Sequence, residues 1–218
     1  MISHKHQCIF VHIPKCGGTS IENMIWEPEE KTTDNLYMGF ISPMYNKYQT
    51  GGLQHLYAAQ IKNEFSPRIF SSYFKFTVVR NPWDKIVSQF TYIKKRPDLM
   101  DFIGMKANDE FKTYLQLIQK KEHVQWSCQY KFFLDENGHS LVDQVYRFEN
   151  FQQAVTDVLN KLNISFKQIL HSKKGSRGHY SEYYDEESKE IIEHLYSKDI
   201  SMLDYHFESQ PEANLSAD

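Results

Sequence analysis

The sequence has few cysteines, no long apolar run and no strong excess of charge, and each of these absences excludes a class of protein. Only three of its 218 residues are cysteine, Cys8, Cys16 and Cys128, and no two form a CxxC pair. This argues against a disulfide framework and a cysteine-bound zinc site, and it favours a reducing compartment. The formal charge of -3 and the isoelectric point near 6.4 point neither to nucleic acid nor to an anionic membrane as a partner. Any anion-binding site must therefore be local.

Targeting and membrane signals are also missing. The first residues, MISHKHQC, contain no apolar signal-peptide core, and no apolar run reaches the roughly 18 residues typical of a membrane helix. We therefore expect a soluble, cytoplasmic chain without an integral membrane segment. The 40% hydrophobic content and the length favour a single domain over residues 1–207, followed by a disordered tail over 208–218.

Three short runs rich in β-branched and aromatic residues predict strands, and a helical pattern follows each of them. The predicted strands cover residues 8–13, 73–79 and 143–148, and the helices after them cover 19–26, 83–95 and 151–162. This threefold repetition of strand, turn and helix predicts a three-layer α/β fold with a central parallel sheet flanked by helices. In such sheets ligands bind beyond the carboxyl ends of the strands, where the three turns lie.

The segments between these units are less regular. Residues 28–52 are polar with scattered tyrosines and predict a mobile loop. Apolar residues at helical spacing predict further helices over 53–65, 109–121 and 185–203.

The stretch VHIPKCGGTS follows the first predicted strand and has the composition of an anion-binding loop. Gly17 and Gly18 allow a sharp turn and a close approach to a ligand, while Thr19 and Ser20 begin a helix whose free N–H groups favour an anion. Lys15 adds a positive charge. Because this lysine precedes the glycines, the order is wrong for a Walker A loop. The loop predicts a phosphate or sulfate cradle, and an ordinary glycine turn capped by Thr19 is the alternative.

A second anion-binding candidate follows the next predicted strand, in VVRNPWDKIVSQF. Asn81 is a good N-cap, and Arg80 lies at the carboxyl end of the strand, at the same sheet edge as the first loop. Ser88 lies two helical turns beyond the cap on the same face, so its hydroxyl is placed to share one anionic group with Arg80. The structural alternative for Arg80 is a salt bridge to Asp84 or Glu149.

The third candidate is HSKKGSRGHYSEYY, where Lys173, Lys174 and Arg177 surround Gly175 and Gly178. A basic, glycine-bearing loop so late in the chain is suited to fold over a ligand as a lid. The alternative is a solvated surface turn.

Taken in this order, HIPKCGGTSI, FTVVRNPWDKIVSQF and VYRFENF resemble the carbohydrate-type sulfotransferases of sulfotransferase family 2. These enzymes use 3'-phosphoadenosine 5'-phosphosulfate (PAPS) and release 3'-phosphoadenosine 5'-phosphate (PAP). The resemblance runs from Ile9 to about Phe207 and includes the closing HYSEYYDEESKEIIEHLYSKDISMLDYHF. It implies a P-loop NTPase-like sulfotransferase fold and metal-independent transfer of a sulfuryl group to a hydroxyl of a glycan or glycolipid.

The resemblance also implies roles for individual residues. The residues that match the loop holding the 5'-phosphosulfate are Lys15, Gly17, Gly18, Thr19 and Ser20. Arg80 and Ser88 match the pair that binds the 3'-phosphate. The segment KKGSRGHY is similar to the late loop over the 3'-phosphate and adenine. The residues it implicates are Lys174, Gly175, Arg177 and Tyr180. Here the sequence has Lys173 and Gly175 where the family pattern has an asparagine and a serine.

Sulfuryl transfer needs one group that stabilises the leaving charge and another that takes the proton of the acceptor hydroxyl. Lys15 and the helix N-terminal amides suit the first task. For the base we choose His55, because it lies between the two cofactor motifs and the resembling enzymes carry a histidine in that interval. The runner-up, His12, is expected to be buried, hydrogen-bonded and structural. His4 and His6 form an HxH pair without a carboxylate or cysteine at ligand spacing, so we expect no metal site.

Three other functions compete with this interpretation. A P-loop-type kinase needs a strand-end aspartate to hold Mg²⁺, and no predicted strand ends in one. A cysteine phosphatase would use Cys16, whose pKa a helix N-terminus lowers, but it needs an arginine six residues later, where Glu22 stands. A nucleotide-binding module without catalysis would keep the same motifs and differ only in turnover.

The residues expected to bind the acceptor match no known sequence motif. Residues 28–52 and 94–140 are predicted as insertions that shape the acceptor pocket. Glu149 is interpreted as a supporting residue near the sheet edge. Trp83 and Trp126 are expected in the core rather than as platforms for adenine.

Overall fold

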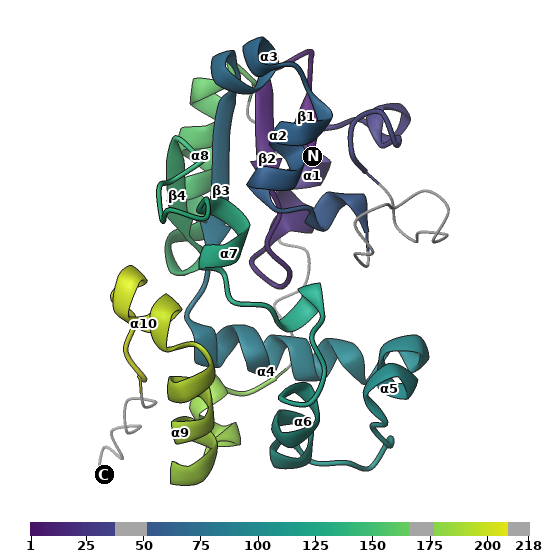
Figure 1. Ribbon diagram of the computed structural model, residues 1–218, viewed down its shortest axis with the longest axis vertical. Coiled ribbons are helices and arrows are strands. Elements are labelled where there is room, and N and C mark those ends of the chain that lie inside the picture. The colour runs from purple at the N-terminus through teal and green to yellow at the C-terminus, as the bar shows by residue number, and fades with distance from the viewer. Residues whose placement is uncertain (38–51, 166–176, 209–218) are drawn as a thin grey trace, which may run out of the picture.

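A four-stranded sheet organises the computed structural model, which describes residues 1–37, 52–165 and 177–208 (Figure 1). Its strands, in sheet order, are β1 (Ile2–Ser3), β2 (Cys8–Val11), β3 (Phe74–Val79) and β4 (Gln144–Arg147). The last three run parallel, whereas β1 is antiparallel to β2. The α/β fold predicted from the sequence is confirmed, but the sheet is mixed because the short β1 adds an antiparallel edge. A two-residue strand has too little periodicity to be predicted.

The two central strands, β2 and β3, are buried, whereas β4 is only partly buried. β2 is a continuous apolar run, and β3 contains the buried Lys75 and Thr77 among its apolar residues. Two neighbouring parallel strands bring their carboxyl ends to the same sheet edge. Phe10 pairs with Phe76 and Val11 with Thr77, so the loops after β2 and β3 leave the sheet side by side.

Helices flank the sheet. The α-helices are α1 (Gly18–Ile25), α2 (Ala58–Glu64), α3 (Pro67–Ser72), α4 (Pro82–Ile93), α5 (Pro97–Ile103), α6 (Phe111–Ile118), α7 (Tyr130–Phe133), α8 (Phe151–Lys161), α9 (Glu186–Leu195) and α10 (Ser197–Leu203). The 3₁₀ turns within the described residues are η1 (Pro28–Glu30), η2 (Leu53–His55), η3 (Val124–Trp126), η4 (Phe148–Asn150) and η5 (Tyr180–Tyr183).

The molecule has two parts, which Figure 1 shows one above the other. The sheet half contains the sheet with α1–α3, α7 and α8, and the helical half contains α4–α6, α9 and α10. The second half packs around α4, whose apolar side chains, among them Trp83, Ile86 and Phe90, are buried. Burial of one such side chain contributes about 2 kcal/mol. Because α4 follows β3 directly, the sheet edge with the two loops faces the helical half.

Two predicted helices are broken in the structure. The one expected over 53–65 divides into η2 and α2, because Leu56 is extended and Tyr57, the N-cap of α2, donates its backbone N–H to Gln60 Oε1 at 2.8 Å. The one expected over 185–203 divides at Tyr196, whose buried hydroxyl donates to the Trp126 carbonyl at 2.6 Å. In both cases a tertiary or capping contact overrides a continuous helical pattern.

Over the three described ranges, none of the helices has the length and apolar character needed to cross a membrane. The cytoplasmic location stays a prediction. Two further expectations, the loop over 28–52 and the tail over 208–218, fall largely on residues 38–51 and 209–218, which lie outside the described residues.

Candidate active site

A cavity of about 480 Å³ lies at the carboxyl ends of β2 and β3. The sequence-predicted residues that line it are Lys15, Gly17, Gly18, Thr19, Ser20, His55, Arg80 and Ser88. They come from three separate segments of the chain, and the fold brings them together. Lys174 and Gly175 lie outside the described residues, and Arg177 joins the group through a contact described below.

The first loop has the tight backbone that its glycines predict. Gly17 has a φ of 82° and precedes α1, and a Cβ at this position would lie 2.6 Å from the ring of Phe151. Lys15 is also left-handed, with a φ of 68°, which costs a non-glycine residue about 1–2 kcal/mol. Residues held in such conformations are often part of a functional site.

Lys15 is a constrained and largely buried cation. Its Nζ lies 4.1 Å from the centre of the Tyr92 ring, a cation–π contact that fixes the side chain over α4. Burial, followed by the nearby Arg80 guanidinium, lowers the pKa of Lys15 to about 8. A bound anion would offset both effects, since an opposite charge favours the protonated form.

Arg80 is held on three sides and is only 7% exposed. Its Nε and Nη2 lie 2.8 and 2.6 Å from Asp84 Oδ2, and its Nη1 donates to the Lys15 carbonyl at 2.9 Å. The guanidinium also lies 4.1 Å from the Phe148 ring centre. The salt bridge to Asp84 that the sequence left open is therefore present. Glu149, the other partner considered, instead accepts from the Asn81 backbone N–H at 2.7 Å.

Arg177 shares the same carboxylate. Its Nη2 contacts Asp84 Oδ1, so two guanidinium groups converge on one aspartate. The other nitrogen of Arg177, Nη1, is buried and has no hydrogen-bond partner within the described part of the chain. Lys15 lies close enough to both arginines to feel their charge, so this corner carries three cations and the one carboxylate of Asp84. The excess positive charge suits an anionic ligand.

Gln129 supports the backbone of the candidate site, and no sequence pattern pointed to it. Its fully buried side chain accepts from the Arg80 N–H and donates to the Arg80 C=O, both at 2.8 Å. The Gln129 side chain thus makes the two backbone hydrogen bonds that a neighbouring strand would make, at the point where β3 ends. Its own backbone is held by Asp199 of α10, which accepts from the N–H groups of Gln129 and Tyr130 at 2.7 and 2.8 Å. No sequence pattern links positions so far apart.

His55 is buried at the cavity wall, with 8% of its surface exposed. Its Nδ1 lies 3.0 Å from the backbone carbonyl of His12. Because a carbonyl only accepts, Nδ1 carries the hydrogen and Nε2 keeps its lone pair in the neutral ring. Burial, and then the charge of His12, hold the pKa of His55 well below its ordinary value. The ring is therefore neutral at pH 7 and can accept a proton.

His12 is buried as expected and lies next to His55, with ring centres 4.5 Å apart. Its Nδ1 is 2.7 Å from Glu22 Oε1. Trp83 and Trp126 are buried, as the sequence also led us to expect.

Cys16 is an inert part of the core. It is 1% exposed, and its Sγ contacts the Pro14 carbonyl at 3.6 Å and Gln129 Oε1 at 3.5 Å. Burial raises the pKa of the Cys16 thiol to about 12. The suggestion that the α1 N-terminus would lower this pKa is wrong, because the thiol points away from solvent into the protein. The phosphatase alternative loses its nucleophile.

Within residues 1–37, 52–165 and 177–208, no three histidine, cysteine or acidic side chains are grouped so that they could hold a metal ion.

Comparison with known proteins agrees with this geometry. A family model described as "Sulfotransferase family" matches residues 1–206. The chain therefore belongs to the sulfotransferase family, whose members transfer sulfuryl groups. An uncharacterized protein of Archaeoglobus fulgidus is 24% identical to this chain over 109 residues, which are 49% of this chain and 82% of the archaeal protein. No solved structure matches the chain.

Proposed function

We propose that this sulfotransferase moves a sulfuryl group from PAPS to a hydroxyl of a carbohydrate acceptor, either a glycan or a glycolipid. The observation that carries the proposal is the single cavity in which the glycine cradle, Lys15, Arg80 and a neutral buried His55 meet. An anion cradle beside a proton acceptor is what sulfuryl transfer to a hydroxyl requires.

The residues present fit a donor with two anionic ends. The 5' end suits Lys15 and the N-terminal amides of α1, and the 3'-phosphate suits Arg80 and Ser88. Arg177, whose buried Nη1 has no hydrogen-bond partner among the described residues, extends the second group. Lys174 and Gly175 are proposed for the same late loop on the strength of the resemblance.

PAPS supplies an activated sulfuryl group whose bridging oxygen can leave with negative charge. His55 takes the proton of the acceptor hydroxyl at Nε2, because its Nδ1 is already committed to the His12 carbonyl. Lys15 stays protonated beside the cradle and stabilises the leaving charge. Its position is set by Tyr92 and by the left-handed backbone, so little reorganisation is needed in the transition state. No step needs a metal ion.

The acceptor assignment draws on the remaining cavity wall. Tyr37, Tyr92, Gln54 and Gln125 line it beside His55, and they come from or border the segments 28–52 and 94–140. Aromatic faces and amide side chains are suited to the apolar face and the hydroxyls of a sugar.

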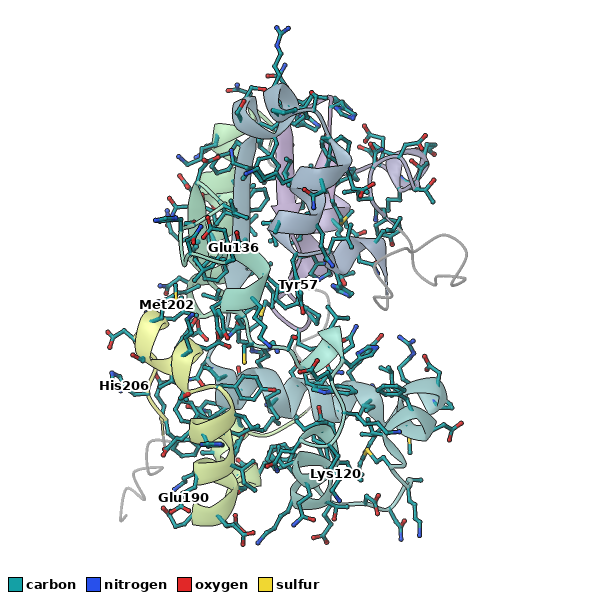
Figure 2. The ribbon with its side chains drawn as sticks, viewed as in Figure 1. Tyr57, Lys120, Glu136, Glu190, Met202 and His206 are labelled. Atoms are coloured by element: carbon teal, nitrogen blue, oxygen red, sulfur yellow. The ribbon has the colours of Figure 1, made fainter. Side chains whose placement is uncertain are left out.

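The test is a screen of glycan and glycolipid acceptors with radiolabelled PAPS, followed by His55→Ala. We expect the wild type to label a hydroxyl acceptor in the presence of EDTA, and His55→Ala to lose about a hundredfold or more in kcat, as for loss of a general base. Binding of PAP to the variant should stay within a few-fold of wild type. His206→Ala is the control, because this exposed histidine lies away from the cavity (Figure 2).

The alternatives give different results. Wild-type PAP binding without turnover on any acceptor would favour a nucleotide-binding module. Activity with ATP that EDTA abolishes, without activity on PAPS, would favour a kinase. Normal turnover in His55→Ala would remove the base assignment while leaving sulfuryl transfer intact.

A further inference from the structure

Two buried histidines line the cavity, and the proposed function uses only one of them. His12 follows β2 directly and is 6% exposed. A Cβ at Gly18 would lie 1.9 Å from its Nε2, so this nitrogen lies against the first residue of α1. Any side chain at this position would displace His12. Position 18 therefore needs glycine for two reasons: the His12 ring leaves no space for a side chain, and the predicted anion cradle needs a close backbone approach.

The other ring nitrogen of His12 faces a buried carboxylate. Glu22, 4% exposed, lies one helical turn after Gly18 and places Oε1 2.7 Å from Nδ1. Burial acts to raise the pKa of Glu22, but His12 and more distant cations bring it below its usual value. A carboxylate buried this completely is almost always paired, and His12 is the partner within contact distance.

The two histidines thus have the same arrangement but opposite partners. Each has an oxygen within 3.0 Å of Nδ1, yet His55 faces a neutral carbonyl whereas His12 faces a carboxylate. A carboxylate stabilises the imidazolium form, and a buried carbonyl does so far less. Neighbouring titratable groups whose surroundings differ in this way commonly divide acid and base roles.

We infer that His12 is a second catalytic residue, held as an imidazolium by Glu22, whose Nε2–H donates a hydrogen bond to an oxygen of the phosphosulfate bound at the N-terminus of α1. The inference rests on the proposed function and adds a cationic donor to it. As the bond from sulfur to the acceptor oxygen forms, the bond from sulfur to the bridging oxygen breaks. The acceptor proton goes to His55. The proton of His12 stays on His12 while charge grows on the oxygen it contacts.

The charged groups around this pair are few among the described residues. Glu22 faces His12 from α1 and His55 faces it from η2, while Lys31 and the amino group of Met1 act on Glu22. Glu22 is therefore the group whose removal changes the charge state of His12 most directly.

The experiment is the pH dependence of kcat/KM for wild type and Glu22→Gln, measured with PAPS and the acceptor found in the screen. Loss of the carboxylate destabilises the imidazolium, so the fall in activity at high pH should move at least one pH unit lower. At neutral pH kcat should drop about a hundredfold, as for loss of one oxyanion donor. PAP, which lacks the sulfuryl group, should bind within about threefold of wild type. Glu190→Gln on α9, far from the sheet in Figure 2, is the charge-matched control.

A second variant keeps the test valid if Glu22→Gln fails to fold. His12→Gln removes the charge but keeps a neutral donor, and it should show the same loss of kcat with normal PAP binding. An unshifted high-pH limb in a folded Glu22→Gln protein, or full turnover in His12→Gln, would overturn the role of His12 while wild-type activity still supported the proposed function. Wild-type protein that never turns over PAPS would overturn both.

Discussion

The sheet half and the helical half contribute to one cavity in different ways. The sheet half supplies the glycine loop, Lys15 and both histidines from the ends of strands and the turns after them. The helical half supplies Ser88 and Tyr92 of α4 to the cavity wall, and Asp199 of α10 holds Gln129, which in turn holds the backbone of Arg80. We propose that the sheet half supplies the groups that meet the reacting atoms, whereas Asp199 and Gln129 fix the position of Arg80. The comparison predicts that substitutions in the two halves lower different kinetic constants.

Lys15→Met should have the largest effect, because it removes the cation from the leaving group and keeps most of the side-chain stem. We expect kcat to fall about 10²–10³-fold, the range for loss of one preorganised donor. The measurement is single-turnover transfer from radiolabelled PAPS. Lys120→Met, an exposed lysine of the helical half that Figure 2 labels, should keep wild-type activity.

The same lysine predicts a high-pH limb in the wild type. Because the pKa of Lys15 is lowered to about 8 in the free protein, kcat/KM should decline as the pH rises through about 8. An arginine at position 15 keeps its charge at every accessible pH, so Lys15→Arg should lack the decline in kcat/KM that deprotonation of Lys15 causes. A wild-type plateau that extends to pH 10 would contradict the assignment.

Gln129→Leu tests the positioning of Arg80 and should lower binding more than turnover. It leaves the buried N–H and C=O of Arg80 without partners, at about 1–3 kcal/mol for each group. We expect a melting temperature several degrees lower and roughly tenfold weaker PAP binding in calorimetry, with kcat at saturating PAPS within a few-fold of wild type. Gln119→Leu, which removes a single bond from an exposed glutamine at the end of α6, is the control. A loss confined to kcat would show that Gln129 does more than position Arg80.

Gly17→Ala should have a smaller effect than Lys15→Met and Gln129→Leu. Comparison with Gly138→Ala separates the effect of backbone strain from that of the contact with Phe151. Both glycines have nearly the same φ, 82° and 83°, but a Cβ at Gly138 meets nothing within 4 Å, whereas one at Gly17 meets Phe151 at 2.6 Å. Both variants should lose about 1 kcal/mol from backbone strain. Gly17→Ala should lose about 1–3 kcal/mol more by overpacking and bind PAP more weakly. Equal losses in thermal unfolding and in PAP binding would show that the contact with Phe151 has no role.

Local patterns predicted much of this architecture. The three parallel strands and the helices after them were recognisable because each strand is a short run rich in β-branched and aromatic residues, followed by a turn and a helical pattern. The loop around Lys15 was recognisable because few structures other than an anion cradle need that order of residues. The sequence did not predict β1, because a strand of two residues is too short to show a periodic pattern. It also did not predict the helix breaks near Leu56 and Tyr196, where capping or tertiary contacts set the backbone conformation.

The residue order alone therefore determined the α/β class, and it predicted the cradle and the choice of Lys15 and Arg80 as its cations, because each depends on neighbours within about ten positions. Tertiary structure alone decided that Cys16 is buried, that Gln129 pairs with Arg80, and that His12 faces Glu22 and Gly18. These facts depend on desolvation and on contacts that the packed chain creates. They set the ionisation of the candidate catalytic groups, which a side chain acquires only in its folded surroundings.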